Sequence, residues 1–577
     1  MSEKMFRKIL TSILITSLVV CGFCSVSSNL TMARQTSRPE NGKPVDYSAA
    51  ISSLKQSVPE LMAKEKVLGA TIALVDGERI VWAEGFGFTD SSRKAQVTAG
   101  TLFSIQSISK SYTATGFLKA MNKGWFKLDD RLRKHLPEFT IKSRDGSDEA
   151  NKMTFRHLLS HWAGLPHEAP VGNGHDDRYC TFDEHIKSIP QTWLKAPVGA
   201  RYSYSNLGFD LTGYALQQRS GKSFEQFMKD ELFKPLGMES STFNQQEAFR
   251  SPSLAKGYVG EQQVPDIIIP MIPAGGMYSN VKDMARFVSL HLSGGKLNGR
   301  TFIPGRLLKQ LYELQFPVEH QVAGYGLGME IKPKYGGTLL GHGGGGYGYS
   351  TKQSWIPEYG IGVIVLTNNG DSGISETLTD EAFKLMLKAK YGAVPADKTF
   401  QLTDKPAIEL DTKTLAPLEG TYRAYNSVVA FQLKDGQLHY IRGNRDLQLK
   451  AHSPTEFTAD GQKFTFYMEQ SGQPKFVHYM GKDGVDTFLP NDRPNEAPGP
   501  NRPEWSEYIG QYQGPAFGIK YTTRIYLKNG YLYSSRGEGT KLLEYKPGLF
   551  FTTEGEAVIF QNNRMSLGNR PVVKVVL

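Results

Sequence analysis

The chain has 577 residues, of which 39% are hydrophobic and 21% charged, and its formal net charge is +10. This composition is typical of a globular protein long enough for two to four domains with substantial cores, and it excludes a fibrous or wholly disordered chain. The positive charge favours cell-envelope surfaces as partners, but no block of Lys and Arg stands out. We therefore interpret it first as a feature of solubility, and we expect no nucleic-acid partner.

The N-terminus has the pattern of a secretory signal. Three basic residues precede the apolar run 9–23, and small residues follow it, so that cleavage is expected near Ser27 or Ala33. The run is too short and too poorly flanked to predict a spanning helix. We therefore assign residues 1–33 to a signal peptide and predict an exported protein, periplasmic or extracellular, with no stable membrane span after cleavage.

The cysteines bear on lipid attachment and on disulfides. Cys21 and Cys24 raise the question of a lipid anchor, but Val20 and Phe23 are bulky where a lipoprotein signal requires a small residue. We do not expect the anchor. Only Cys180 remains after signal cleavage, so an internal disulfide is impossible and the core must hold the fold together.

Residues 45–392 alternate between strand-like and helical patterns. An amphipathic helix is expected from Tyr47 to about Leu68, followed by two β-rich runs about an Asp76-Gly77 turn. Helical patterns fill the middle, and another strand hairpin precedes a closing helix that ends near Tyr391. Strands at both ends with helices between them predict an α+β domain: one antiparallel sheet flanked by helices, with a helical subdomain inserted.

One segment of this region, 166–190, has no periodic pattern. Residues of types that ligate metals lie in it, among them His167, His175, Asp176, Asp177, Cys180 and His185. A metal site is one alternative, but the spacing matches no structural zinc pattern. We therefore predict no metal and interpret the segment as a lid over a cleft.

After residue 395 helical patterns vanish and short strand-like runs alternate with turns. Three stretches recur further along the chain: 420–422 as 510–512, 433–436 as 527–530, and 457–466 as 551–560. The segment 492–502, rich in Pro and Asn, is typical of a linker between two copies. We predict two small all-β barrel-like domains, 396–492 and 503–577, each of about eight short strands.

A Ser-x-x-Lys pattern is the first candidate for chemistry. It occurs five times, starting at Ser52, Ser91, Ser107, Ser253 and Ser279, so context must choose among them. Only Ser107 stands between an apolar approach and a long helical pattern, whereas Ser279 is expected to cap a helix. Residues at i and i+3 share a helix face, so the Lys110 amine can reach the Ser107 hydroxyl. A serine needs such a base to become a nucleophile, and lysine can be that base only if its pKa is lowered.

Two further motifs follow in chain order. The three segments Ser107-Ile108-Ser109-Lys110, Tyr204-Ser205-Asn206 and His342-Gly343-Gly344 together resemble the motifs of the serine β-lactamases and penicillin-binding proteins. The forms of the second and third look like the class C β-lactamase-like branch, which includes D,D-peptidases, D-aminopeptidases and esterases. The resemblance covers about residues 45–392, and the tandem barrels are similar to an arrangement in D-aminopeptidase relatives.

The resemblance implies a role for each matching residue. Ser107 would be the acylated nucleophile and Lys110 the base that deprotonates it. Tyr204 would carry a proton between serine and leaving group, and Asn206 would bind the substrate's amide or ester side chain.

The third motif departs from the β-lactamases. His342 stands where those enzymes carry lysine, and it could share protons with Tyr204 without a permanent charge. Gly344 and Gly345 are assigned to substrate binding, and the N–H groups of Ser107 and Gly345 would form an oxyanion hole. Because a fixed cation is missing at this position, we expect weaker binding of a β-lactam carboxylate. We also expect that the protein needs no cofactor.

Other interpretations of the same residues are less favourable. Gly343, Gly345 and Gly348 match a dinucleotide fingerprint, but a strand follows where a helix is required. No G-x-S-x-G sequence occurs in the chain, which excludes an α/β-hydrolase elbow. We predict an exported serine hydrolase that acts through an acyl-enzyme on small ester, amide or peptide substrates, with D-residues among the candidates. A β-lactamase or D,D-carboxypeptidase is the alternative, and an envelope-peptide binding protein without turnover is the alternative of another class.

Overall fold

The computed structural model describes residues 44–575 except 177, 319, 425–426, 482–483, 495 and 536–538. The predicted signal peptide 1–33, with Cys21 and Cys24, lies outside the described residues, and so does Asp177. Within the part of the chain that is described, no helix is both long and apolar enough to cross a membrane.

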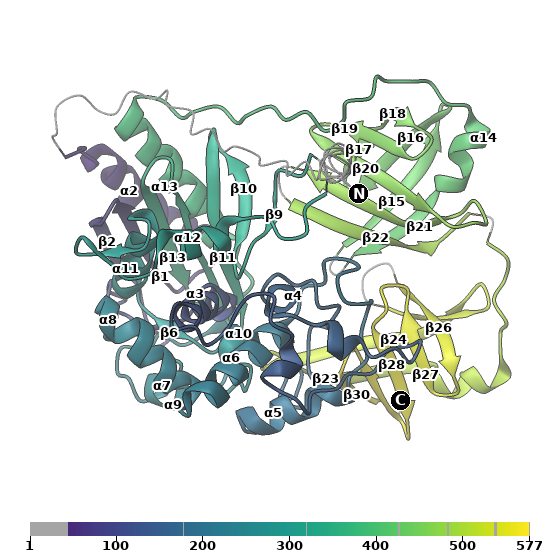
Figure 1. Cartoon of the computed structure of the whole chain (residues 1–577), viewed down its shortest axis with the longest axis horizontal. Helices are drawn as coiled ribbons and strands as arrows, with labels where there is room; N and C mark the ends of the chain where they lie inside the picture. The colour runs from purple at the N-terminus through teal and green to yellow at the C-terminus, as the bar shows by residue number, and fades with distance from the viewer. Residues whose placement is uncertain are drawn as a thin grey trace, which may run out of the picture. The chain divides into compact units, whose positions relative to one another are not determined.

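A seven-stranded sheet is assembled from the two ends of the region 45–392, as predicted (Figure 1). Its order is β2-β1-β13-β12-β11-β10-β9, and neighbouring strands are antiparallel. The strands are β1 (Gly69–Asp76), β2 (Arg79–Gly87), β9 (Gly324–Tyr325), β10 (Glu330–Lys334), β11 (Gly337–Gly346), β12 (Tyr349–Ile356) and β13 (Ile361–Thr367). The inner strand β13 is buried along its whole length, as expected for a strand covered on both faces.

Helices cover both faces of this sheet. Because side chains alternate along a strand, Ile72 and Leu74 of β1 join the cluster under α2 (Ser48–Lys64) and α13 (Ile374–Tyr391). Ala73 and Val75 point the other way, into the cluster that contains the apolar face of α11 (Val281–Leu292). The N-cap of α11 is Asn280, whose side chain accepts hydrogen bonds from two backbone N–H groups. The expectation that Ser279 is this cap was therefore wrong by one residue.

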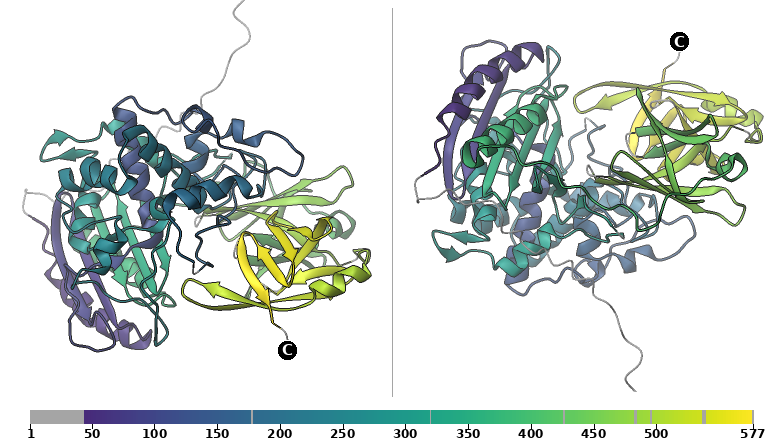
Figure 2. Two further views of the ribbon diagram at one scale, coloured as in Figure 1. Left: turned by 90° about the horizontal axis from the view of Figure 1, so that it is seen from below. Right: turned by 90° about the horizontal axis from the view of Figure 1, so that it is seen from above.

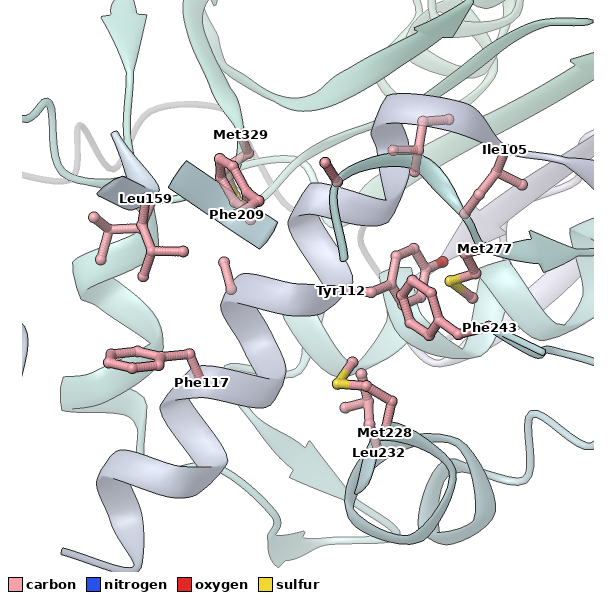
Figure 3. Packing of buried hydrophobic residues seen from close by; sticks show 14 of the residues in the cluster. Ile105, Tyr112, Phe117, Leu159, Phe209, Met228, Leu232, Phe243, Met277 and Met329 are labelled. Carbon is pink, nitrogen blue, oxygen red and sulfur yellow. The ribbon is translucent and has the colours of Figure 1, made fainter. Parts of the chain in front are cut away.

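The helical subdomain surrounds α3 (Ser109–Asn122), whose side chains are almost all buried. Figure 3 shows Tyr112 and Phe117 of α3 among the apolar side chains of this core, with Phe243 and Met277 beside Tyr112. The Tyr112 hydroxyl donates to Gln353 of β12 and so ties the helix to the sheet. The other helices are α4 (Phe155–Leu159), α5 (Phe182–Ser188), α6 (Asn206–Ser220), α7 (Phe224–Met228), α8 (Lys234–Leu236), α9 (Gln245–Phe249), α10 (Ile272–Gly275) and α12 (Gly305–Leu308).

The segment 166–190 differs from the predicted lid without regular structure. It contains helix α5, which begins after a capping box made by Thr181 and Glu184. This Thr-x-x-Glu signal was present in the sequence. Most described residues between 168 and 176 are buried, and Asn173 donates to the carbonyl of Asn569 in the second barrel. The segment is thus packed against other parts of the chain.

The first all-β region is a nine-stranded antiparallel sheet with the order β17-β16-β15-β14-β22-β21-β20-β19-β18. This sheet is barrel-like, as predicted, with nine strands where about eight were expected, and no pairing joins β17 to β18 among the described residues. The strands are β14 (Gly420–Ala424), β15 (Ser427–Lys434), β16 (Gln437–Arg442), β17 (Arg445–Gln448), β18 (Lys450–Ser453), β19 (Glu456–Ala459), β20 (Gln462–Met468), β21 (Pro474–Gly481) and β22 (Gly484–Asp492). Helix α14 (Thr412–Leu415) precedes them.

The second all-β region is a closed barrel of eight strands, as predicted, and is drawn in yellow in Figure 2. Its strands are β23 (Gly510–Ala516), β24 (Ile519–Lys528), β25 (Tyr531–Ser534), β26 (Thr540–Lys546), β27 (Leu549–Thr552), β28 (Ala557–Gln561), β29 (Arg564–Leu567) and β30 (Arg570–Lys574). The repeat is visible in the contacts: the hydroxyl of Tyr422 in β14 donates to the carbonyl of Leu418, and that of Tyr512 in β23 donates to Tyr508. Both distances are 2.8 Å.

Candidate active site

Ser107 lies in a single 3₁₀ turn, Gln106–Ile108, that leads directly into α3. The preceding residue, Gln106, has a φ of +49°, a conformation that costs free energy for a residue with a side chain. Two contacts hold it: the Gln106 amide donates to Ser104 Oγ at 2.7 Å, and Ser109 Oγ donates to the Gln106 carbonyl at 2.6 Å. The turn therefore presents Ser107 at the start of the helix. Nothing in the sequence marked Gln106 as unusual.

The Lys110 amine occupies the position that the sequence predicted, one turn after Ser107. Its Nζ is 3.0 Å from Ser107 Oγ, and it also donates to Asn206 Oδ1 at 2.8 Å and to the Ala274 carbonyl at 2.9 Å. Burial lowers the pKa of Lys110 to about 7, against the opposing charges of Asp210 and Glu168. The lysine therefore meets the condition for a base: a large fraction is neutral near pH 7.

Tyr204 and Asn206 approach the same amine from the start of α6. Lys110 Nζ lies 5.0 Å from the centre of the Tyr204 ring. Asn206 is the first residue of α6, and Ser205 caps that helix through a hydrogen bond from Leu207. In this structure the Asn206 carbonyl oxygen holds the lysine, a contact that the expected role in substrate binding does not include.

His342 lies on β11 and is buried. Its Nε2 is 2.9 Å from the Tyr325 hydroxyl, and its Nδ1 contacts the carbonyl of Gly343. Burial lowers the pKa of His342 to about 4, so the ring is neutral at pH 7. A neutral ring donates from Nδ1 to the carbonyl and accepts at Nε2 from the Tyr325 hydroxyl. Tyr325 is a site residue that sequence reasoning missed, because no motif contains it.

The two glycines after His342 have different surroundings. A Cβ on Gly344 would stand 2.2 Å from the carbonyl oxygen of Ile105 and 2.5 Å from Thr351 Oγ1. Gly344 is thus required for β11 to pass close to the turn that carries Ser107. A Cβ on Gly345 would meet nothing within 4 Å, and Gly345 lines a cavity.

This cavity, about 510 Å³ in volume, contains the predicted nucleophile. Ser107, Tyr204, His342 and Gly345 line one side. The all-β regions contribute to the other, with the side chains of Ala424, Arg442, Val485, Asp486, Thr487 and Glu554. Sequence reasoning did not find these residues, since no local pattern brings a distant barrel to a catalytic serine.

The charges of the cavity wall have both signs. Arg201 and Arg442 are cationic, while Asp486 and Glu554 are carboxylates. Burial, together with the charge of Glu554, raises the pKa of Asp486 to about 6. Among the described residues, one carboxylate oxygen of Glu554 is buried without a hydrogen-bond partner, but it lies 3.7 Å from Arg423 Nε in an ion pair. Its charge is therefore compensated in part, while its hydrogen-bonding capacity is not.

Contacts between the second all-β region and the segments around the candidate site hold the wall of the cavity that lies beyond Ser107. Asn569 donates to the backbone carbonyl of Glu168 at 2.8 Å and also to the Thr192 hydroxyl. Arg201 donates to the carbonyl of Glu554 at 2.6 Å. Glu168 is itself fully buried and pairs with His167 at 2.6 Å. The barrel thus contacts the backbone of residues next to the predicted machinery.

The segment 166–190 also bears on the alternative of a metal site. Among the described residues, which omit Asp177, no group of three or more His, Cys, Asp or Glu side chains is arranged to hold a metal ion. Cys180 is a buried free thiol.

Known proteins similar to this chain were identified by sequence. AmpH of Escherichia coli strain K12, named a D-alanyl-D-alanine-carboxypeptidase/endopeptidase, is 28% identical over 54% of this chain and 84% of its own length. Penicillin-binding protein 4 of Amycolatopsis lactamdurans is 26% identical over 63% of this chain and 94% of its own. Penicillin-binding protein 4* of Bacillus subtilis is 24% identical over 75% and 95%.

Solved structures share the fold. The octameric penicillin-binding protein homologue from Pyrococcus abyssi is 23% identical, with a TM-score of 0.51 over 76% of this chain and 99% of its own. SurE is 20% identical, with a TM-score of 0.55 over 77% and 100%. The Beta-lactamase family matches residues 54–383, more than half of the sequence. The chain therefore belongs to the Beta-lactamase family and is a serine hydrolase of that family.

Proposed function

We propose that this protein is exported and that it hydrolyses small ester, amide or short peptide substrates through an acyl-enzyme on Ser107. The observation that carries the proposal is the Lys110 amine, 3.0 Å from Ser107 Oγ, with a pKa that burial lowers to about 7. An amine that is largely neutral near pH 7 can accept the serine proton, and the serine faces a cavity that a substrate can enter.

The reaction proceeds in two halves. In the first, neutral Lys110 takes the proton of Ser107 as Oγ attacks the acyl carbon, and the N–H groups of Ser107 and Gly345 hold the resulting oxyanion. Tyr204, beside Lys110, passes a proton to the leaving alkoxide or amine, so the bond to the leaving group breaks and an ester forms on Ser107. In the second half, water gives a proton to Lys110 or Tyr204 as it attacks that ester. The bond between the acyl carbon and Ser107 Oγ then breaks, Oγ takes the proton back, and the carboxylic acid is released.

The cavity supports small substrates in preference to polymers. Its wall beyond the serine is made by the all-β regions, and a volume of about 510 Å³ suits a ligand of a few residues. Asp486 and Glu554 would attract an ammonium group, and Arg442 a carboxylate. Short peptides and amino-acid derivatives carry such ends, so they suit this wall.

β-Lactams rank lower among the candidate substrates. Their ring carboxylate requires a fixed cation at the third motif, and His342 is neutral there at pH 7 because burial lowers its pKa to about 4. Arg442 belongs instead to the wall that the all-β regions contribute. The names of the relatives keep a D,D-carboxypeptidase as the second candidate, since AmpH is named for that activity. A binding protein without turnover is the third, and a lowered lysine pKa beside the serine favours an enzyme over it.

A substrate panel tests the proposal. It contains nitrophenyl esters, D- and L-aminoacyl amides, D-Ala-D-Ala peptides and a chromogenic cephalosporin, each with wild type and Ser107→Ala. We expect turnover of esters and of aminoacyl or short peptide substrates, with none in the variant. A cephalosporin hydrolysed faster than every other member would overturn the ranking, and turnover of none would favour the binding protein.

A further inference from the structure

We propose that the buried pair His185 and Asp210 is a positioning device for Lys110, which orients Ala274 and sets the charge around the amine. The inference rests on the proposed function, in which Lys110 is the base. Neither residue belongs to the three sequence motifs, and neither lines the cavity of Ser107. Both side chains are completely buried, His185 on α5 and Asp210 on α6.

A chain of hydrogen bonds joins this pair to the lysine. His185 Nε2 is 3.1 Å from Asp210 Oδ2, and the other oxygen of Asp210 accepts from the Ala274 N–H at 3.2 Å. The carbonyl of the same residue, Ala274, accepts from Lys110 Nζ at 2.9 Å. Asp210 therefore holds the short helix α10 where its carbonyl faces the amine, and Lys110 is directed toward Ser107.

His185 holds Asp210 in turn, and its two contacts favour the cationic ring. Burial raises the pKa of Asp210, and the hydrogen bond and charge of His185 act against that rise. The Nδ1 of His185 is 2.8 Å from the carbonyl of Val171, which can only accept. With Nε2 on a carboxylate and Nδ1 on a carbonyl, both ring nitrogens have acceptors, and this favours the protonated ring. Burial lowers the pKa of His185, but the Asp210 carboxylate and the Val171 carbonyl raise it more, so the net shift is upward.

The two charges act on Lys110 in opposite directions. The Asp210 carboxylate is the largest influence that raises the pKa of Lys110, and Glu168 is the next. The protonated ring of His185 opposes the field of Asp210, because it carries the opposite charge and contacts the carboxylate directly. Other titratable groups around the lysine are Ser107, Tyr204, His161, His167 and His342. All of these remain in the variants below.

The test is the pH dependence of acylation by an activated nitrophenyl ester in the full chain. Asp210→Asn keeps the shape and removes the negative charge, so the midpoint of the rise in rate should move down by about one pH unit. His185→Gln keeps a hydrogen-bond donor and removes the positive charge, so the midpoint should move up. The double variant should behave like Asp210→Asn, because in that single variant the ring of His185 is already neutral, and replacing a neutral ring by Gln changes no charge.

Asp183→Asn is the matched control. Asp183 lies on the same helix as His185 and also contacts α6, through Gln217, but it is exposed. The midpoint of acylation in Asp183→Asn should therefore stay at the wild-type value.

The outcomes separate positioning from packing. A residue with only a structural role would lower the melting temperature without moving the midpoint of the acylation rate. An unmoved midpoint in Asp210→Asn, or equal shifts in the same direction for both variants, overturns the inference. If Asp210→Asn does not fold, His185→Gln decides alone: an upward shift supports the device, and no shift overturns it. Loss of labelling in Ser107→Ala together with unmoved midpoints would overturn this inference and leave the proposed function intact.

Discussion

The Ser107–Lys110 pair shows what a sequence motif contains and what burial adds to it. The i, i+3 spacing predicts that the two side chains meet, and they lie 3.0 Å apart. The sequence cannot give the lysine pKa, because it depends on burial and on the charges of Asp210 and Glu168, which come from other segments. Likewise His342 was recognised from its motif, but its partner Tyr325 was not.

Two substitutions test the assigned roles of the base and the proton carrier. Lys110→Ala and Tyr204→Phe should each slow acylation by at least about two orders of magnitude, the scale of positioned acid–base catalysis. Stopped-flow kinetics with a nitrophenyl ester measures the rate, and circular dichroism checks the fold. If Tyr204→Phe reacted nearly as fast as wild type, Tyr204 would be a packing residue only.

The pH profile follows from the lysine. Because only neutral Lys110 accepts a proton and its pKa is about 7, the acylation rate should rise about tenfold per unit below pH 7 and level off above it. His342, with a pKa of about 4, is already neutral there and adds no second rise. A plateau reached only near pH 10, the range of an ordinary lysine, would contradict the assignment.

At the scale of elements, strands and long helices were predicted well, because periodicity and turn residues are local signals. One antiparallel sheet built from both ends of the region, and the helices α2 and α13, follow the prediction. The short helix α5 was missed although its capping box was legible, and the barrel-like all-β regions were predicted without the pairing of their strands. Closure depends on strand register and tilt, which no local pattern specifies.

The contact between β11 and the Ser107 turn gives a prediction with an internal control. Gly344→Ala places a Cβ 2.2 Å from the Ile105 carbonyl, so β11 must move away from Ser107. We expect a loss of ~1–3 kcal/mol of stability, the usual cost of overpacking, together with slower acylation. Gly345→Ala keeps its N–H and meets nothing within 4 Å, so it should be close to wild type in both thermal unfolding and rate. Equal effects of the two would show that Gly344 is not a packing constraint.

At the scale of the whole molecule, the all-β regions take part in the site. Asp486 and Glu554 line the cavity, and Asn569 contacts the backbone of Glu168. The internal repeat was legible in the sequence, but its approach to the serine was not, since long-range docking leaves no local signal. The domain boundaries at about 392 and 503 remain predictions.

A chain that ends at Tyr391 tests how far the catalytic region is independent. The sheet and its closing helix α13 are complete there, so the chain should be soluble and its serine should react with a small acylating probe. Without Asp486 and Glu554 it should lose the preference for aminoacyl and short peptide substrates over simple esters. Insolubility or an unreactive serine would mean that the all-β regions complete the core or the site.

The central claim is that Ser107 becomes acylated, and mass spectrometry of the trapped adduct tests it most directly. Full-length protein is quenched in acid during turnover of a nitrophenyl ester, digested, and compared with Ser107→Ala and with Ser52→Ala, an exposed Ser-x-x-Lys serine on α2. We predict one acyl group on the peptide that contains Ser107, in wild type and in Ser52→Ala. An adduct of undiminished yield in Ser107→Ala, or one on another residue, would contradict the account.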